Sequence, residues 1–191
     1  MDSRGTGTVC PSPYPSPQKG RGNWAQGERA LVTTPSREYP DAPRAGVGAV
    51  VLDGDRVLLV RRGAPPSRGK WSIPGGLIQL GERIEDAVVR EVQEECGLQV
   101  RLLGLCGVID RVVTDEPPDP ASPAPVRYHY IIIDYVATAA GGSLQAGSDA
   151  AEARWVPVAL LSQYETTDGL AAMIHRAVKL RHASLQGGLI G

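Results

Sequence analysis

Residues 76–98 read GLIQLGERIEDAVVREVQEECGL, and this stretch decides the fold. Glu91, Glu94 and Glu95 stand at positions i, i+3 and i+4, which are neighbours on one face of an α-helix. Like charges at that spacing repel each other, so an unliganded helix gains nothing from them. A divalent cation would reverse the effect, because hard ions such as Mg²⁺ and Mn²⁺ prefer carboxylate oxygens.

The helical phase separates the acidic residues of this stretch. At about 100° per residue, an apolar arc is expected to pack on a sheet, and its members are Ile84, Val88, Val89, Val92 and Cys96. Glu95 falls inside that arc, Glu91 at its edge and Glu94 further out. A solvated charged face explains Glu85 and Asp86. It does not explain Glu95, because burying an unpaired carboxylate is costly and a bound metal would remove the penalty.

The stretch resembles the Nudix box, G-x5-E-x7-R-E-U-x-E-E-x-G-U, in which U is aliphatic. Every fixed position matches, and the matching residues are Gly76, Glu82, Arg90, Glu91, Val92, Glu94, Glu95, Gly97 and Leu98. Residues 69–76, GKWSIPGG, resemble the strand and turn that lead into the box. Residues 45 to about 180 resemble the Nudix domain as a whole, whereas the first 40 or so do not.

The resemblance implies an α/β fold, a Nudix-type α/β/α sandwich with a mixed sheet. It also implies an enzyme that hydrolyses the pyrophosphate of a nucleoside diphosphate linked to another group. One to three divalent ions, Mg²⁺ or Mn²⁺, would be held by the main-chain carbonyl of Gly75 and by the carboxylates of Glu91, Glu94 and Glu95. Such ions neutralise the diphosphate and acidify a bound water, and a carboxylate can then take the proton.

The resemblance implies that Glu82, Arg90, Glu94 and Glu95 are catalytic residues. In this set, Arg90 would orient Glu91, and Glu82 would support the metal-binding carboxylates. Arg90 and Glu94 also form an i, i+4 pair, so a role in helix stability alone stays open. Glu152 is a candidate general base or extra metal ligand, because several Nudix subfamilies use a carboxylate from this region. A plain surface carboxylate is the alternative for Glu152.

The segments GKWSIPGGLIQLGE and RYHYIIIDYVA are most similar to bacterial ADP-ribose pyrophosphatases, which implies cleavage of ADP-ribose to AMP and ribose 5-phosphate. Trp71, Arg111, Tyr128 and Tyr130 are candidates for stacking a base or contacting a phosphate. The alternative for Trp71 is an aromatic residue at the edge of the core. Two rival functions are a house-cleaning nucleoside-triphosphate pyrophosphohydrolase and a nucleotide-sensing regulator on a Nudix fold. The intact box disfavours the regulator.

The composition fits one domain in a chain of 191 residues. The net charge of −1 and the absence of a basic stripe argue against nucleic-acid binding. No apolar run reaches the ~20 residues of a membrane helix, and no signal peptide is visible, so the cytoplasm is expected. The three cysteines show neither zinc nor disulfide spacing, and Cys96 and Cys106 are expected in the core. A homodimer stays open, since dimers are common in the resembled group.

The chain divides into a Pro/Gly-rich tail over residues 1–41, predicted to be disordered, a domain over residues 42–182 and a flexible tail over residues 183–191. Strands are predicted at residues 45–52, 56–62, 71–73, 99–113, 127–139 and 153–156. Helices are predicted at residues 83–96 and from about residue 168. A hairpin turn is expected at residues 53–55, a tight turn at residues 74–76 and a Pro-rich loop at residues 115–125.

Overall fold

The computed structural model describes residues 37–147 and 150–187. Its strands are β1 (Arg44–Asp53), β2 (Arg56–Arg62), β3 (Trp71–Ser72), β4 (Gly75–Leu77), β5 (Leu98–Thr114), β6 (Val126–Gly142) and β7 (Ala150–Pro157). Its helices are α1 (Ile84–Cys96), the 3-10 helix η1 (Val158–Gln163) and α2 (Leu170–Gly187). Most of the tail predicted at residues 1–41, including Cys10, lies outside the described residues. Helix α2 extends beyond residue 182, the predicted end of the domain.

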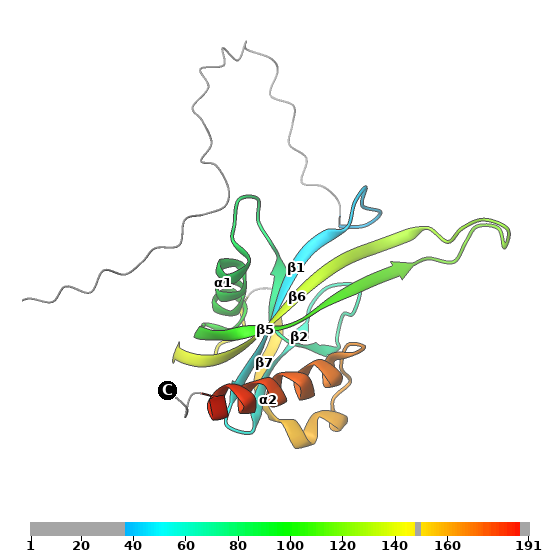
Figure 1. The fold of residues 1–191 in the computed structure, drawn as a ribbon. Coiled ribbons are helices and arrows are strands. Elements are labelled where there is room, and N and C mark those ends of the chain that lie inside the picture. The colour runs from blue at the N-terminus through cyan, green and yellow to red at the C-terminus, as the bar shows by residue number, and fades with distance from the viewer. Residues whose placement is uncertain (1–36, 148–149, 188–191) are drawn as a thin grey trace, which may run out of the picture. The chain divides into compact units, whose positions relative to one another are not determined.

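The sheet is mixed, as predicted. Its main path runs β3-β2-β1-β6-β5, with β4 paired to β1 and β7 paired to β2. Strands β1 and β6 are parallel, and the other pairings are antiparallel. Helices α1 and α2 lie on opposite faces of this sheet (Figure 1). The expected α/β/α sandwich is therefore confirmed.

Strand β1 is apolar along its whole buried length because it supplies a core on each face. Val47, Ala49 and Val51 face the core beneath α1. Val50 and Leu52 alternate with them and face the core beneath α2. Strand β2 alternates in the same way, and the two-residue connection between the strands confirms the predicted hairpin. The period of two along each strand thus builds both cores at once.

Helix α1 matches its predicted bounds to within one residue. It ends at Gly97, whose left-handed φ of 67° lets its N–H bond the carbonyl of Gln93. The apolar arc is centred differently from the prediction, because Ala87 is fully buried while Val89 is 37% exposed. The prediction that Val89 packs on the sheet was therefore wrong. Val89 lies at the far edge of the arc, and the sheet contacts the opposite edge around Ala87.

The predicted tight turn at residues 74–76 was wrong, because β4 begins at Gly75 and pairs antiparallel with β1. Two backbones approach closely here. A Cβ added at Gly75 would lie 2.2 Å from the carbonyl oxygen of Val47 and 2.8 Å from the Cα of Gly48. Glycine is therefore needed so that this strand can pack against β1, and the strand carries the front of the box into place beside α1.

Strands β5 and β6 form a long hairpin arm that extends away from the rest of the sheet (Figure 1). Residues 37–41, assigned to the tail from sequence, contact this arm. Glu38 accepts hydrogen bonds from Tyr128 and Arg127, and Tyr39 donates to Asp115. The folded part of the chain therefore begins earlier than residue 42.

No helix in the described part of the chain is long and apolar enough to cross a membrane.

Asp134 is a buried carboxyl group in the middle of β6. It is 2% exposed, and its Oδ1 has no hydrogen-bond partner among the described residues. A Cβ added at Gly48, its neighbour on β1, would lie 2.3 Å from that oxygen. Burial raises the pKa of Asp134 from 3.8 to about 6. The folded protein therefore binds the carboxyl proton of Asp134 more tightly than the unfolded chain does. The free energy of unfolding consequently falls as the pH rises from 3.8 to about 6.

We expect Asp134→Asn to be more stable than the wild type at pH 8, by about 3 kcal/mol before any cost of the buried amide. The advantage should shrink by more than half by pH 4, because the wild-type carboxyl is then protonated in the folded protein. Denaturant unfolding of both proteins at pH 8, 6 and 4 measures the difference. A difference that does not change with pH would contradict the assignment of a buried, unpaired carboxylate.

Candidate active site

Arg90 organises the acidic residues of the box. Its Nε and Nη2 donate to the two oxygens of Glu82 at 2.7 and 2.9 Å, a bidentate pair. Its Nη1 donates to Glu91 at 2.6 Å and to Glu94 at 3.0 Å. Its Nη2 also donates to the carbonyl of Leu77, at 3.1 Å. One guanidinium therefore joins α1, the loop before it and the end of β4.

The pKa values follow from this network. Hydrogen bonds from Arg90, and then from the backbone N–H of Gln79, lower the pKa of Glu82 to about 2. Burial raises the pKa of Glu91 in spite of its hydrogen bond to Arg90. Glu82 is therefore an anion that holds Arg90 in place and is too acidic to take up a proton near neutral pH. Glu91 is a desolvated carboxylate that gains most from a further positive charge.

Glu91, Glu94 and Glu95 form what we call the carboxylate ridge of α1. Gly75 donates its N–H to Oε2 of Glu95 at 3.0 Å. A Cβ added at Gly76 would lie 2.5 Å from the carboxyl atoms of Glu91. The side chain of Glu94 is 56% exposed, whereas Glu91 and Glu95 are partly buried. Glu94 is thus the outermost of the three, as the helical phase predicted, and Gly76 leaves room for Glu91.

The carboxylate ridge has the donor chemistry of a site for a hard divalent ion. In the described part of the chain, no three metal-ligating side chains already converge on one point. Two ridge carboxylates are tied to Arg90 instead. The donor set nevertheless fits such an ion, because Glu91 is desolvated and Glu95 lies against the backbone of Gly75. These residues, together with the Gly75 carbonyl, are the ones that would hold it.

Trp71 lies at the edge of the α2-side core. Its ring meets that of Tyr164 edge-on, with 5.5 Å between centroids. The guanidinium of Arg154 stands 4.9 Å over its centre. Its backbone is fixed to residues before α2, since Trp71 N–H bonds the carbonyl of Glu165 and its own carbonyl accepts from Thr167. The structure thus shows the core-edge position, and base stacking by Trp71 stays a prediction.

The other candidate substrate residues lie on the arm. Arg111 and Tyr130 are paired directly across β5 and β6. Nη2 of Arg111 donates to Ser67 at 3.1 Å, which fixes the guanidinium beside the loop after β2. Tyr128 stacks near Tyr130 with 6.1 Å between centroids, but it is only 4% exposed. Its hydroxyl is bonded to Glu38, which points to a role in fixing the N-terminal segment.

Glu152 is not brought to the carboxylate ridge. It alternates with Ala153 and Trp155, which pack in the core beneath α1, so its side chain faces the other side of the sheet. There it forms an ion pair with Arg154. A general-base role for Glu152 stays a prediction that this arrangement does not favour.

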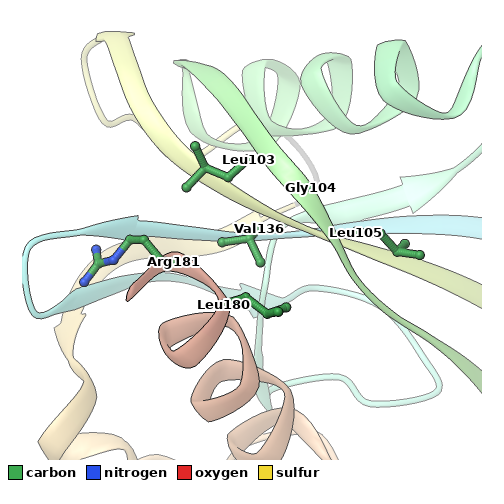
Figure 2. Close-up of a pocket in the computed structure, with 6 residues that line it drawn as sticks. All are labelled: Leu103, Gly104, Leu105, Val136, Leu180 and Arg181. Atoms are coloured by element: carbon green, nitrogen blue, oxygen red, sulfur yellow. The ribbon is translucent and has the colours of Figure 1, made fainter. Parts of the chain in front are cut away.

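A hollow lies between β5, β6 and the middle of α2 (Figure 2). Its volume is about 80 Å³, and its lining residues are Leu103, Gly104, Leu105, Val136, Leu180 and Arg181. Ligand pockets are usually several times larger. Arg181 is also tied to the carbonyl of Gly54. This hollow is therefore a packing feature between sheet and helix.

Sequence reasoning missed Arg62, the last residue of β2. The structure places it near both Glu95 and Arg111. The available signal was its position, because a strand of buried Val and Leu residues ends in two consecutive arginines just before a loop.

The family model described as NUDIX domain matches residues 42–177, which is more than half of the chain. The chain belongs to the Nudix family. Its box residues therefore lie in the structural context that the family pattern requires, with a glycine strand, a loop and a helix in sequence. The fold agrees with a solved Nudix structure as well.

Three relatives illustrate this Nudix membership. An ADP-ribose pyrophosphatase of Methanocaldococcus jannaschii is 35% identical over 113 residues, covering 59% of this chain and 61% of that protein. The 8-oxo-dGDP phosphatase NUDT18 of Homo sapiens is 32% identical over 130 residues, covering 62% of this chain and 36% of that protein. The crystal structure of a MutT Nudix hydrolase from Burkholderia pseudomallei superposes with a TM-score of 0.59 and 28% identity, covering 71% of this chain and 98% of that one.

Proposed function

We propose that this protein hydrolyses the pyrophosphate bond of a nucleoside diphosphate linked to another group, with Mg²⁺ or Mn²⁺ as cofactor. The observation that carries the proposal is the arrangement of the carboxylate ridge. Arg90 holds Glu91 and Glu94 on one side, and the N–H of Gly75 holds Glu95 on the other. Arg90 supplies one positive charge to these three carboxylates and to Glu82, so the ridge keeps a net negative charge that a divalent cation would offset.

Each residue has a defined task in this proposal. Bound at the ridge, divalent ions neutralise the diphosphate and lower the pKa of an attacking water. Glu91 and Glu95 keep their carboxylates against the β4 backbone, so the reacting phosphate is positioned by rigid elements. Glu94, which is exposed, is the carboxylate best placed to receive a proton from water. Arg90, held bidentately by Glu82, fixes the orientation of Glu91.

ADP-ribose is the substrate that we favour, with AMP and ribose 5-phosphate as products. The support is the similarity to an ADP-ribose pyrophosphatase noted above. The Pro-rich loop of residues 115–125 adds no support, because it lies at the far tip of the β5–β6 arm, away from α1 (Figure 1).

The second candidate is house-cleaning of damaged or surplus nucleotides. It is supported by the similarity to a phosphatase of 8-oxo-dGDP. The same carboxylate ridge would serve either reaction, so the choice depends on the binding of the two ends of the substrate. A nucleotide-sensing regulator is less well supported, because every fixed position of the box is present.

A side-by-side kinetic comparison tests the proposal. We expect kcat/KM for ADP-ribose to exceed that for any single nucleoside triphosphate by at least ~10-fold, about 1.4 kcal/mol in transition-state binding. The panel contains ADP-ribose, NADH, a nucleotide sugar, dGTP and 8-oxo-dGTP, with products identified by mass. Excess EDTA should abolish turnover, and Mg²⁺ should raise the melting temperature. A preference for a triphosphate supports house-cleaning, and full turnover in EDTA contradicts the metal mechanism.

A further inference from the structure

Residues 37–39 are bound to β6, although their sequence looked like part of a tail. The backbone N–H of Tyr39 donates to the carbonyl of Arg127 at 2.8 Å. The carboxylate of Glu38 accepts from Nη2 of Arg127 at 3.0 Å and from the hydroxyl of Tyr128. Backbone and side-chain contacts therefore fix this short segment, which we call the N-terminal clamp, to the β5–β6 arm.

The clamp contacts the arm where the sheet is narrowest. Strand β1 first pairs with β6 at Arg44 and Tyr130. Beyond that row the arm consists of β5 and β6 alone, up to the pair of Thr114 and Val126. A two-stranded ribbon is marginally stable in water. The contacts of the clamp with residues 127–128 therefore restrain side chains that two strands alone would hold less firmly.

Tyr128 connects the clamp to Tyr130. Tyr128 is only 4% exposed, and its ring lies 6.1 Å from that of Tyr130, with 17° between the two planes. The hydroxyl of Tyr128 is bonded to Glu38, and the guanidinium of Arg127 stands 5.7 Å from the centre of its ring. Tyr130 is two residues further along the same face of β6 and is half-buried. A buried ring with a fixed hydroxyl thus supports a partly accessible ring.

Tyr130 lies close to the candidate active site. The side chains of Tyr130 and of Arg37, the first residue of the clamp, are both near the guanidinium of Arg62, and so is Glu95 of the carboxylate ridge. The clamp, the tyrosine pair and the inner end of the ridge therefore meet around one side chain. A nucleotide with its diphosphate at the ridge would have its nucleoside within reach of the Tyr130 ring.

We propose that Glu38 is a positioning residue for the nucleoside end of the substrate. It fixes Tyr128, and Tyr128 holds the ring of Tyr130 in the orientation in which a base stacks on it. This inference rests on the proposed function and deepens it, because it gives the N-terminal clamp a part in substrate binding. Every base has a π-face, so the clamp affects affinity for the nucleoside rather than the choice among bases.

The test is binding of AMP to the full chain, measured by calorimetry. Glu38→Ala should weaken AMP binding at least ~5-fold, because a displaced ring loses part of its stacking energy with the base. Glu38→Gln should keep most of the affinity, since its amide oxygen can still accept from Tyr128. Tyr128→Phe should match Glu38→Ala. The double variant should bind no more weakly than either single variant, because both changes remove the same hydrogen bond.

Three controls separate positioning from a general loss of structure. Inorganic pyrophosphate with Mg²⁺ has no base, and its affinity should change less than about twofold in Glu38→Ala. With ADP-ribose, KM should rise while kcat changes less than about twofold, because the ridge is untouched. Asp41→Asn is the matched variant, since Asp41 is exposed and makes no hydrogen bond or ion pair within residues 37–147 and 150–187. Its AMP affinity should equal that of the wild type.

Melting curves without ligand show whether the variants fold, and Tyr128→Phe keeps the buried ring if Glu38→Ala does not. Equal AMP binding by the wild type and the variants, or no AMP binding by the wild type, would overturn the positioning role. Equal losses of AMP and pyrophosphate binding, or additive losses in the double variant, would overturn it as well. AMP binding that depends on Glu38 without turnover of ADP-ribose would retain the role and reject only the proposed substrate.

Discussion

Glu95→Gln is expected to lower kcat by at least ~10²-fold while the fold stays intact, given the size of catalytic electrostatic effects. The amide keeps the volume of the side chain and an oxygen that can accept the N–H of Gly75, now at 3.0 Å from Oε2. Only the charge is removed, and with it the ability to hold a cation against the backbone. Steady-state kinetics on the preferred substrate at saturating Mg²⁺ measures the loss, and a melting curve verifies the fold.

Glu85→Gln is the matched control on the same helix. Glu85 lies in the first turn of α1, away from the ridge, and its Oε1 accepts a hydrogen bond from Tyr135 at 3.1 Å. Glutamine can keep that bond, so kcat should change less than about threefold. If both substitutions lowered kcat equally, the argument that one face of α1 carries the chemistry would be refuted.

Arg90→Met is expected to reduce both stability and activity. Arg90 is 21% exposed and serves three carboxylates, so its loss leaves Glu82 and Glu91 without their shared donor. Breaking a partly buried pair from one side is strongly unfavourable, and we expect a loss of about 2 kcal/mol, or roughly 4–8 °C in melting temperature. kcat/KM should fall at least ~10²-fold, because Glu91 loses its orientation. Thermal unfolding and kinetics at pH 7.5 provide the measurements.

The pH dependence of this variant gives an independent test. Arg90 lowers the pKa of Glu82 from 4.5 to about 2, so the stabilisation is present above pH 4.5 and is lost as the pH falls toward 2. The stability difference between Arg90→Met and the wild type should therefore shrink in acid. Arg83→Met is the control, since Arg83 makes no side-chain capping bond to α1. A difference that persists unchanged at pH 3 would assign Arg90 a packing role instead.

The helix that carries the box could be predicted from sequence, because the residues that indicate its buried face and its end are close together in the chain. The spacing of Val88, Val92 and Cys96 fixed the buried face, and Gly97 fixed the end. The same phase placed Glu95 inward and Glu94 outward. The β1–β2 hairpin was readable for the same reason, since the turn residues and the apolar runs are adjacent in the chain.

Structural features that depend on contacts between residues far apart in the sequence could not be predicted. Gly75 and Gly76 have no side chains to show a period, and they form a strand only because β1 lies alongside. The position of Val89 depended on how far the sheet extends under α1. Nothing local in the sequence singles out Arg62, and only the fold brings Arg111 near it. Sequence spacing identified which groups carry the chemistry of the ridge but not which groups face it.

The alternation along β1 limits how the length of this chain can vary. Deleting or inserting one residue within β1 would exchange the side chains that face α1 with those that face α2, so no such change is confined to one core. It would also replace Gly48, where an added Cβ meets Asp134 at 2.3 Å. Length variants should therefore be confined to segments outside the paired strands, such as the 115–125 loop. A deletion scan scored for soluble protein should show β1 as a block with no tolerated position.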